Sequence, residues 1–291
     1  MKYTGTTYRP PYEANSLLLQ VTTGCTHNKC TFCTMYKDVT FSMESLDQIE
    51  ADLREAKAIY GRVKRVFLVN GDAFVLSARR LKPIAQRIIH YFPEVEVITM
   101  YASINNIKAK TDTDLVELRE LRINDLWVGT ETGHAETLAY MNKGFDLDES
   151  YRQLERLNQA GIRHIDILIF GAAGRGKGME NAAANADLIN ASKPLGVSMT
   201  TLGAFGESRL ARDVEAGRFT PATELEVLRE QIRMIELIQV ETRYLGIHGI
   251  NTVPFDALLP RDRDAAVQRV KNAIEQLDDG ILNSVSERYS I

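Results

Sequence analysis

Six short apolar segments, each followed by a stretch with helical periodicity, limit most strongly how this chain can fold. They are rich in Val, Ile and Leu at successive positions, which is typical of strands covered on both faces of a parallel sheet. The segments occupy residues 16–21, 65–69, 95–100, 125–129, 164–170 and 196–202. Because no linker rich in Pro, Gly or Ser separates them, the pattern predicts one parallel α/β barrel, complete or partial.

The stretches between these segments carry apolar stripes at helical spacing. The first stripe consists of Met43, Leu46, Ile49, Leu53, Ala56 and Ile59. Another predicted helix begins at Asp146, whose carboxylate can cap the first turn while Glu149 reaches back, and it ends at Gly161.

The pattern changes after the sixth segment. Residues 221–240 are expected to form a helix, followed by a short apolar segment, a loop at 249–260 and a last helix at about 261–277. We expect this tail to cap the barrel. The predicted division is therefore a core of residues 1–220 and a helical and loop extension of residues 221–291, packed on the core.

Charge and hydropathy exclude several classes of protein. The formal net charge of −4 shows no excess of basic residues, which argues against a polymeric nucleic acid as partner. The N-terminal residues do not resemble a signal peptide, and no apolar stretch approaches the ~20 residues needed to cross a bilayer. We therefore expect a cytoplasmic protein without a membrane partner.

All three cysteines of the chain lie in the stretch GCTHNKCTFC, residues 24–33, directly after the first predicted strand. The spacing C-x4-C-x2-C places Cys25, Cys30 and Cys33 in one loop, which in a barrel lies at the catalytic mouth. An odd number of clustered thiols in a reducing compartment favours metal binding over disulfides. Two metal sites remain open: structural zinc with His27 as fourth ligand, and a [4Fe-4S] cluster that leaves one iron open.

The position of the cysteine loop resembles that of the radical S-adenosylmethionine (SAM) superfamily, whose loop follows the first strand of a partial (β/α)6 barrel. The commonest spacing there is C-x3-C-x2-C, so this loop is one residue longer. The resemblance implies a [4Fe-4S] cluster bound by the three cysteines and SAM as cofactors, with an electron donor such as flavodoxin or ferredoxin. It places Phe32 beside the SAM adenine; a ring that packs into the core is the alternative.

Further residues match positions of the same superfamily. The stretch VNGDAF, residues 69–74, looks like its glycine-rich motif, and this implies that Gly71 and Asp72 receive the amino group of SAM. Ser103 occupies a place where one branch of the family often has a ribose-binding acid. Asp166 interrupts an apolar strand, where an unpaired carboxylate is costly to bury, and it is similar in place to a SAM-contacting aspartate.

The stretch WVGTETGHAETLAYMNKG, residues 127–144, resembles the branch that includes oxygen-independent coproporphyrinogen oxidase. The resemblance implies that Glu131 binds the SAM ribose and Lys143 the SAM carboxylate. Two structural alternatives stay open: Glu131 could cap the next helix, and Lys143 could stabilise the C-terminus of that helix.

The resemblance implies reductive cleavage of SAM to a 5'-deoxyadenosyl radical, which abstracts hydrogen from a small substrate. Three cysteines leave none for a cysteine-ligated auxiliary cluster. A lyase acting on a nucleoside-like or amino-acid-like metabolite is our working hypothesis; an oxidative decarboxylase or dehydrogenase and a non-catalytic zinc-binding module are the alternatives. Polar groups at predicted strand ends and in the tail loop are candidates for substrate contact: Tyr101, Arg175, Glu207, His248 and Asn251.

Overall fold

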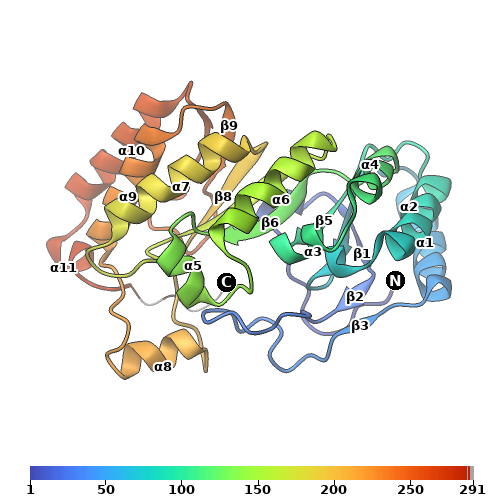
Figure 1. Cartoon of the computed structure of the whole chain (residues 1–291), viewed down its shortest axis with the longest axis horizontal. Coiled ribbons are helices and arrows are strands. Elements are labelled where there is room, and N and C mark those ends of the chain that lie inside the picture. The colour runs from blue at the N-terminus through green and yellow to red at the C-terminus, as the bar shows by residue number, and fades with distance from the viewer. Residues whose placement is uncertain (287, 289–291) are drawn as a thin grey trace. The chain divides into compact units, whose positions relative to one another are not determined.

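Parallel strands alternate with helices along the chain, as predicted. The computed structural model describes residues 1–286 and 288 (Figure 1). The six predicted strands are confirmed as β1 (Leu17–Gln20), β4 (Arg65–Val69), β5 (Val97–Ala102), β6 (Leu126–Glu131), β7 (His164–Phe170) and β8 (Gly196–Thr201). The chain divides into two compact units. Unit 1 comprises Met1–Asn28, Tyr36–Gly129 and Arg152–His164, and unit 2 comprises Lys29–Met35, Thr130–Tyr151 and Ile165–Ile291.

Unit 1 is built on parallel strands in the order β1-β4-β5-β6. Its helices are α1 (Leu46–Tyr60), α2 (Ala78–Tyr91), α3 (Ile104–Lys108) and α4 (Asp112–Glu120), and α1 packs on α2. Two single turns, η1 (Pro11–Glu13) and η2 (Ala73–Val75), and an antiparallel pair of short strands, β2 (Thr22–Thr23) and β3 (Ser42–Met43), complete it.

Helix α1 begins later than the sequence pattern predicts. The hydroxyl of Ser45 accepts a hydrogen bond from the Gln48 amide and caps the first turn. Met43 therefore lies on β3 and is exposed, and Ile59 is exposed as well. The predicted stripe was wrong at both ends, because the buried face of α1 extends only from Ile49 to Ala56.

A buried charge cluster fixes the amino ends of the unit 1 strands. Arg65, the first residue of β4, forms ion pairs with Glu13 and Asp125, both at 2.7 Å. Trp127 donates its indole N–H to Glu13. Burial by itself would raise the pKa of the Glu13 carboxyl, but Arg65 holds this pKa below its ordinary value. The cluster stabilises the end of the strands opposite to the one that carries the cysteine loop.

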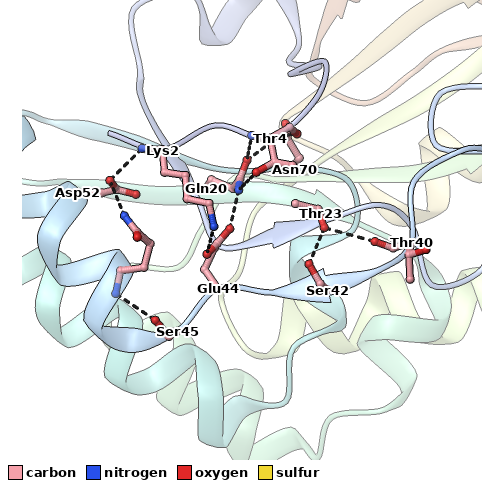
Figure 2. Close-up of polar contacts among 11 residues, drawn as sticks. Lys2, Thr4, Gln20, Thr23, Thr40, Ser42, Glu44, Ser45, Asp52 and Asn70 are labelled. Carbon is pink, nitrogen blue, oxygen red and sulfur yellow. Dashed lines mark hydrogen bonds and ion pairs between the residues drawn. The ribbon is translucent and has the colours of Figure 1, made fainter.

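Residues near the N-terminus are tied to the same strands, as Figure 2 shows around Gln20. The Gln20 carboxamide oxygen accepts from the Thr4 amide at 2.8 Å and from the Asn70 side chain at 3.1 Å. Its amide nitrogen donates to Glu44 at 2.7 Å. Gln20 thereby orients Asn70, the residue before Gly71.

Unit 2 contains β7, β8 and β9 (Thr242–Leu245) as parallel neighbours and β10 (Asp256–Leu259) antiparallel to β9. Its helices are α5 (Ala135–Met141), α7 (Gly178–Ser192), α8 (Arg209–Glu215), α9 (Glu224–Leu237), α10 (Arg263–Gln276) and α11 (Asp279–Leu282). Helix α9 packs between α7 and α10 (Figure 1). Helix α6 (Leu147–Gln159) begins in unit 2 and ends in unit 1.

The tail differs from the sequence prediction in two places. The short apolar segment after α9 is a further parallel strand, β9, and the predicted loop at 249–260 contains strand β10. Each strand has only four residues, too few for a clear periodic signal. The tail from 221 onward belongs to the same compact unit as β7 and β8, and the boundary at residue 220 stays a prediction. Within the described residues, no helix has the length and apolar character required to span a bilayer.

Candidate functional site

The segment that carries Cys30 and Cys33 is anchored at Thr31, the residue after Cys30. The Thr31 amide donates to the Met141 carbonyl at 3.0 Å, and its hydroxyl donates to the Tyr140 carbonyl at 2.5 Å. Its own carbonyl accepts from a backbone amide of α8 at 2.9 Å. Because Thr31 is buried and fixed to α5 and α8, unit 2 sets the positions of the two cysteines on either side of it.

Glu131 and Lys143 form a buried ion pair beside these cysteines. The Lys143 ammonium donates to the Glu131 carboxylate at 2.6 Å, and the two side chains are 11% and 8% exposed. Burial alone would lower the pKa of Lys143, but the Glu131 carboxylate and the negative thiolate forms of Cys30 and Cys33 raise it above its ordinary value. Lys143 is therefore favoured as a cation, and its charge interacts with those of both thiols.

The backbone of Glu131 has an unusual conformation. Glu131 ends β6 with a φ of 65°, which a residue with a side chain adopts only when its surroundings hold it there. The N-cap of the next helix is His134, and the Glu131 carboxylate is paired with Lys143. Glu131 therefore does not occupy the capping position that the sequence left open for it.

Phe32 packs in unit 2 against a small apolar cluster. The cluster is formed by Met141, Ile169 and Ala172, with Leu202 also in contact. This is the core packing that the sequence left open as the alternative for Phe32. Phe32 remains part-exposed, and its contact with adenine stays a prediction.

In unit 1, the turn after β4 brings Gly71 against the backbone that precedes Cys25. Gly71 has a φ of 66°, and a Cβ there would lie 1.8 Å from the carbonyl oxygen of Gly24. The Gly71 amide donates to the Tyr36 hydroxyl at 2.8 Å. Only glycine fits this position, because the turn lies directly on the Gly24 backbone, and the contact of Gly71 with SAM stays a prediction.

Asp72 connects this turn to the cysteine loop and to α3. Its carboxylate accepts from the Thr26 hydroxyl at 3.0 Å and from the Asn106 side chain at 3.3 Å. Thr26 directly follows Cys25. Ser103 caps α3, since its hydroxyl accepts from the Asn106 amide and its own amide donates to the Asn106 side chain. The structure therefore brings Asp72 and the Ser103 cap together through Asn106.

A buried lysine lies behind the same turn. The Lys110 ammonium donates to the carbonyls of Phe74 at 2.6 Å and Asn106 at 3.1 Å, and it lies 3.9 Å from the centre of the Phe74 ring. Burial lowers the pKa of Lys110 to about 8, although Asp72 opposes this shift. Lys110 is thus a buried amine held by backbone carbonyls in unit 1, and the charge of Asp72 acts on it.

The cysteine loop reverses direction at Asn28. Asn28 has a φ of 42°, a left-handed conformation that asparagine tolerates. Its side chain donates to the Tyr36 carbonyl at 2.7 Å, and Lys37 donates to the Asn28 carbonyl at 2.7 Å. The longer spacing between Cys25 and Cys30 therefore contains a fixed reversal of the chain.

Asp166 has a different environment. It is the third residue of β7, four residues before the strand end, and its side chain is buried. The hydroxyl of Ser192, at the end of α7, donates to it at 3.1 Å. Its predicted contact with SAM stays a prediction, and this contact with α7 gives the carboxylate a structural partner.

The five candidates for substrate contact have unequal surroundings. Asn251 is bonded within unit 2, since its oxygen accepts from Thr201 and its nitrogen donates to two backbone carbonyls. Burial lowers the pKa of His248, and burial raises that of Tyr101. Arg175 is half-exposed and 4.0 Å from a carboxylate of α9, and Glu207 is exposed. Their roles toward substrate stay predictions.

The cysteine loop offers donors whose chemistry, but not whose arrangement in this structure, suits an iron–sulfur cluster. Within residues 1–286 and 288, no group of three or more His, Cys, Asp or Glu side chains is arranged as a metal site. All three cysteines are present as part-exposed thiols, and soft thiolates are the ligands that iron–sulfur clusters use. Cys30 and Cys33 lie beside Lys143, which offsets the negative charge that such thiolates carry.

Several residues that shape the site were missed in the sequence. Tyr36 carries no motif signal. Asn181 and Asn185 of α7 bond to the turn after Glu131, and Glu230 of α9 bonds to Asn181. The two asparagines recur four residues apart on an alanine-rich face of the segment MENAAANAD, and this polar pair on an otherwise apolar face was a usable signal.

Solved structures similar to this chain share its fold. The coproporphyrinogen III oxidase HemN of Escherichia coli, described as a radical SAM enzyme, has 18% identity and a TM-score of 0.56, covering 76% of this chain and 52% of that one. Methylornithine synthase, PylB, has 14% identity and a TM-score of 0.53, covering 88% and 81%.

A further similar structure is the radical SAM methyltransferase TsrM of Kitasatospora setae, solved with cobalamin and a [4Fe-4S] cluster. It has 17% identity and a TM-score of 0.55, covering 69% of this chain and 39% of that one. This chain therefore spans about half or less of TsrM and HemN. These likenesses confirm the predicted α/β class, a partial barrel of the radical SAM type.

A search of the curated proteins gives no match. The family model for the radical SAM superfamily matches residues 19–189, more than half of the chain. Members of this superfamily use a [4Fe-4S] cluster and SAM. The matched region contains the cysteine loop, the turn at Gly71 and the Glu131–Lys143 pair, and the chain belongs to the radical SAM superfamily.

Proposed function

We propose that this chain is a radical SAM enzyme that binds a [4Fe-4S] cluster through Cys25, Cys30 and Cys33 and acts on a small substrate. When bound, the cluster and SAM supply a 5'-deoxyadenosyl radical, formed by reductive cleavage of SAM, that removes a hydrogen atom from the substrate. The observation that carries the proposal is the buried Glu131–Lys143 pair beside Cys30 and Cys33.

Each end of SAM has a matching group in the proposed site. The Lys143 ammonium has donors beyond the one given to Glu131, and these suit the SAM carboxylate. The Glu131 carboxylate keeps acceptor capacity for ribose hydroxyls. The backbone of Gly71 and the carboxylate of Asp72 suit the amino group, and Phe32 offers an aromatic face to adenine.

The substrate is proposed to be a nucleoside-like or amino-acid-like metabolite and the reaction a lyase reaction, with flavodoxin or ferredoxin as electron donor. The chain has no cysteines for a second cluster, which favours one radical step on a compact molecule. Oxidative decarboxylation or dehydrogenation of a similar molecule uses the same site, and product analysis separates these reactions.

The test is anaerobic purification with iron analysis, followed by incubation with SAM and dithionite. We expect brown protein with about four irons per chain and formation of 5'-deoxyadenosine. Cys30→Ala should lose both the cluster and the cleavage. Thr223→Val, which alters the cap of α9, serves as control and should keep both.

A zinc-binding module gives the opposite result. Colourless protein that holds one zinc and forms no 5'-deoxyadenosine would overturn the proposal. SAM cleavage that survives in Cys30→Ala would overturn the assignment of the cluster ligands.

A further inference from the structure

A series of buried hydrogen bonds leads from the turn after Glu131 to the carboxyl group of Glu230 on α9. The Thr132 hydroxyl donates to the Asn181 oxygen at 2.6 Å, and the Asn181 nitrogen donates to Glu230 at 2.6 Å. The second oxygen of Glu230 accepts from the Gly171 amide, at the end of β7, at 2.9 Å. Thr132, Asn181 and Glu230 are each 0% exposed. The series therefore joins the ends of β6 and β7 through two helices.

The backbones around this series are packed without spare room. The Gly133 amide donates to the Asn185 side chain at 2.7 Å, and a Cβ on Gly133 would lie 2.2 Å from the Ala184 carbonyl oxygen. A Cβ on Gly178 would lie 3.2 Å from the Glu230 carboxylate. The turn after β6 lies directly on α7, and the start of α7 lies directly on Glu230.

Glu131 depends on support of this kind. Its left-handed backbone conformation is unfavourable for a residue with a side chain and persists only where neighbouring contacts hold it. Thr132 is the next residue, and its hydroxyl also accepts from the His134 amide at 2.9 Å. Holding Thr132 therefore limits the conformations open to Glu131.

We propose that Glu230 is a positioning residue that acts through Asn181 to hold the turn after β6 and to keep the Glu131 carboxylate directed at Lys143. The inference rests on the proposed function only where it names SAM as the molecule that Glu131 receives. A buried polar network whose donors and acceptors are all paired specifies one geometry. When one residue of the network is removed, its former partners stay buried without a hydrogen bond.

Two substitutions of Glu230 distinguish the effect of its hydrogen bonds from the effect of its side-chain volume. Glu230→Leu removes both acceptors, so the Asn181 nitrogen and the Gly171 amide lose their partner. Glu230→Gln keeps the shape, and its carboxamide can accept from Gly171 and donate to Asn181. Asn181 then turns its amide over and donates to Thr132, so the network survives with one direction reversed.

The matched control is Glu224→Leu. Glu224 is also a buried carboxylate of α9, 1% exposed, but its partners are Arg288, Thr252 and the Ser286 amide. Its loss should destabilise the fold without reaching the turn after β6. Asn181→Leu breaks the series at its middle and replaces Glu230→Leu if that variant does not fold.

The experiment measures three quantities on the reconstituted holoprotein: SAM affinity, iron content, and amide hydrogen exchange of residues 130–136. For Glu230→Leu we expect SAM affinity to fall about 10- to 100-fold, as for partners that orient a ligand-binding group, with faster exchange at 130–136 and unchanged iron. Glu230→Gln should remain close to wild type. Combining Glu230→Leu with Asn181→Leu should add little further loss, because both act through one path.

Wild-type exchange and SAM affinity in Glu230→Leu would overturn the inference. Equal changes in Glu224→Leu would overturn it as well, because they would show a general loss of stability. If the wild-type protein neither binds nor cleaves SAM, the proposed function fails, while exchange at 130–136 still tests whether Glu230 holds the turn.

Discussion

The ammonium of Lys143 and the carboxylate of Glu131 lie 2.6 Å apart, and about nine-tenths of each side chain is buried. Such a pair is costly to break, because the remaining charge has neither water nor a partner. Its position beside Cys30 and Cys33 makes it both a stabilising contact and the centre of the proposed SAM site.

Removing one member of this pair should cost more than removing both. We expect Lys143→Met to lower the free energy of unfolding by about 3–5 kcal/mol, because Glu131 is left buried and charged. The double variant Lys143→Met/Glu131→Gln should regain much of this loss. Urea unfolding of the wild type, Lys143→Met, Glu131→Gln and the double variant measures the coupling, and additive losses would show that the two charges do not depend on each other.

A methyl group at Gly71 should disrupt the turn after β4. Gly71→Ala meets the Gly24 carbonyl oxygen at 1.8 Å, and we expect a loss of about 3 kcal/mol or more. The matched control is Gly61→Ala, with nearly the same φ, 64°, and no atom within 4 Å of the added Cβ. It should lose only about 1 kcal/mol from the backbone conformation. Equal losses in thermal unfolding would contradict the close approach.

The pH dependence of stability should report Glu230. Burial raises the pKa of this carboxyl to about 8; Asn181 and Gly171 oppose the shift, and Glu226, which faces Arg175, adds to it. Between the ordinary value of 4.5 and about 8, the folded protein keeps a proton that the unfolded chain releases. Stability should therefore decrease as pH rises through this window, by at most about 5 kcal/mol.

Glu230→Gln cannot titrate and should remove this dependence. The measurement is the free energy of unfolding at pH 5.5 and 8.5 for wild type and variant. A wild-type curve no steeper than that of Glu230→Gln would show that the carboxyl keeps its ordinary pKa.

The anchor between Cys30 and Cys33 should affect cluster retention. Thr31→Val removes the hydroxyl that donates to the Tyr140 carbonyl, at a cost of about 1 kcal/mol. We expect the loop to loosen and iron per chain to fall on dilution. Thr223→Val loses a capping hydrogen bond of α9 at a similar cost. Equal iron loss in both variants would mean that general stability, not the loop anchor, retains the cluster.

The sequence predicted the six strands of the partial barrel because their buried faces demand long apolar runs. The cysteine spacing singled out the cysteine loop, and the resemblance to the radical SAM superfamily pointed to Gly71, Glu131 and Lys143, whose roles toward SAM stay predictions. It did not predict β9 and β10, which are four residues each. The contacts of Asp166 with Ser192 and of Ser103 within its own helix cap depend on which face each side chain takes, and a single residue does not reveal that.

Glu230 and Tyr36 were missed for another reason. Glu230 lies on a helix whose sequence looks partly solvated, and only the packing of α7 on α9 buries it. Tyr36 bonds to Gly71, 35 residues away. Such long-range polar contacts follow from tertiary packing, which local sequence patterns do not reveal.

Tyr36 connects the long cysteine loop to the turn after β4. Its backbone carbonyl accepts from the Asn28 side chain inside the long spacing, and its side-chain hydroxyl accepts from the Gly71 amide, so one residue holds the loop and the turn to each other. The length of the cysteine loop and the position of the Gly71 turn therefore depend on each other. Trimming the loop to the commoner spacing would pull on Tyr36 and displace Gly71, so a graft of a shorter cysteine motif would need a compensating change at position 36.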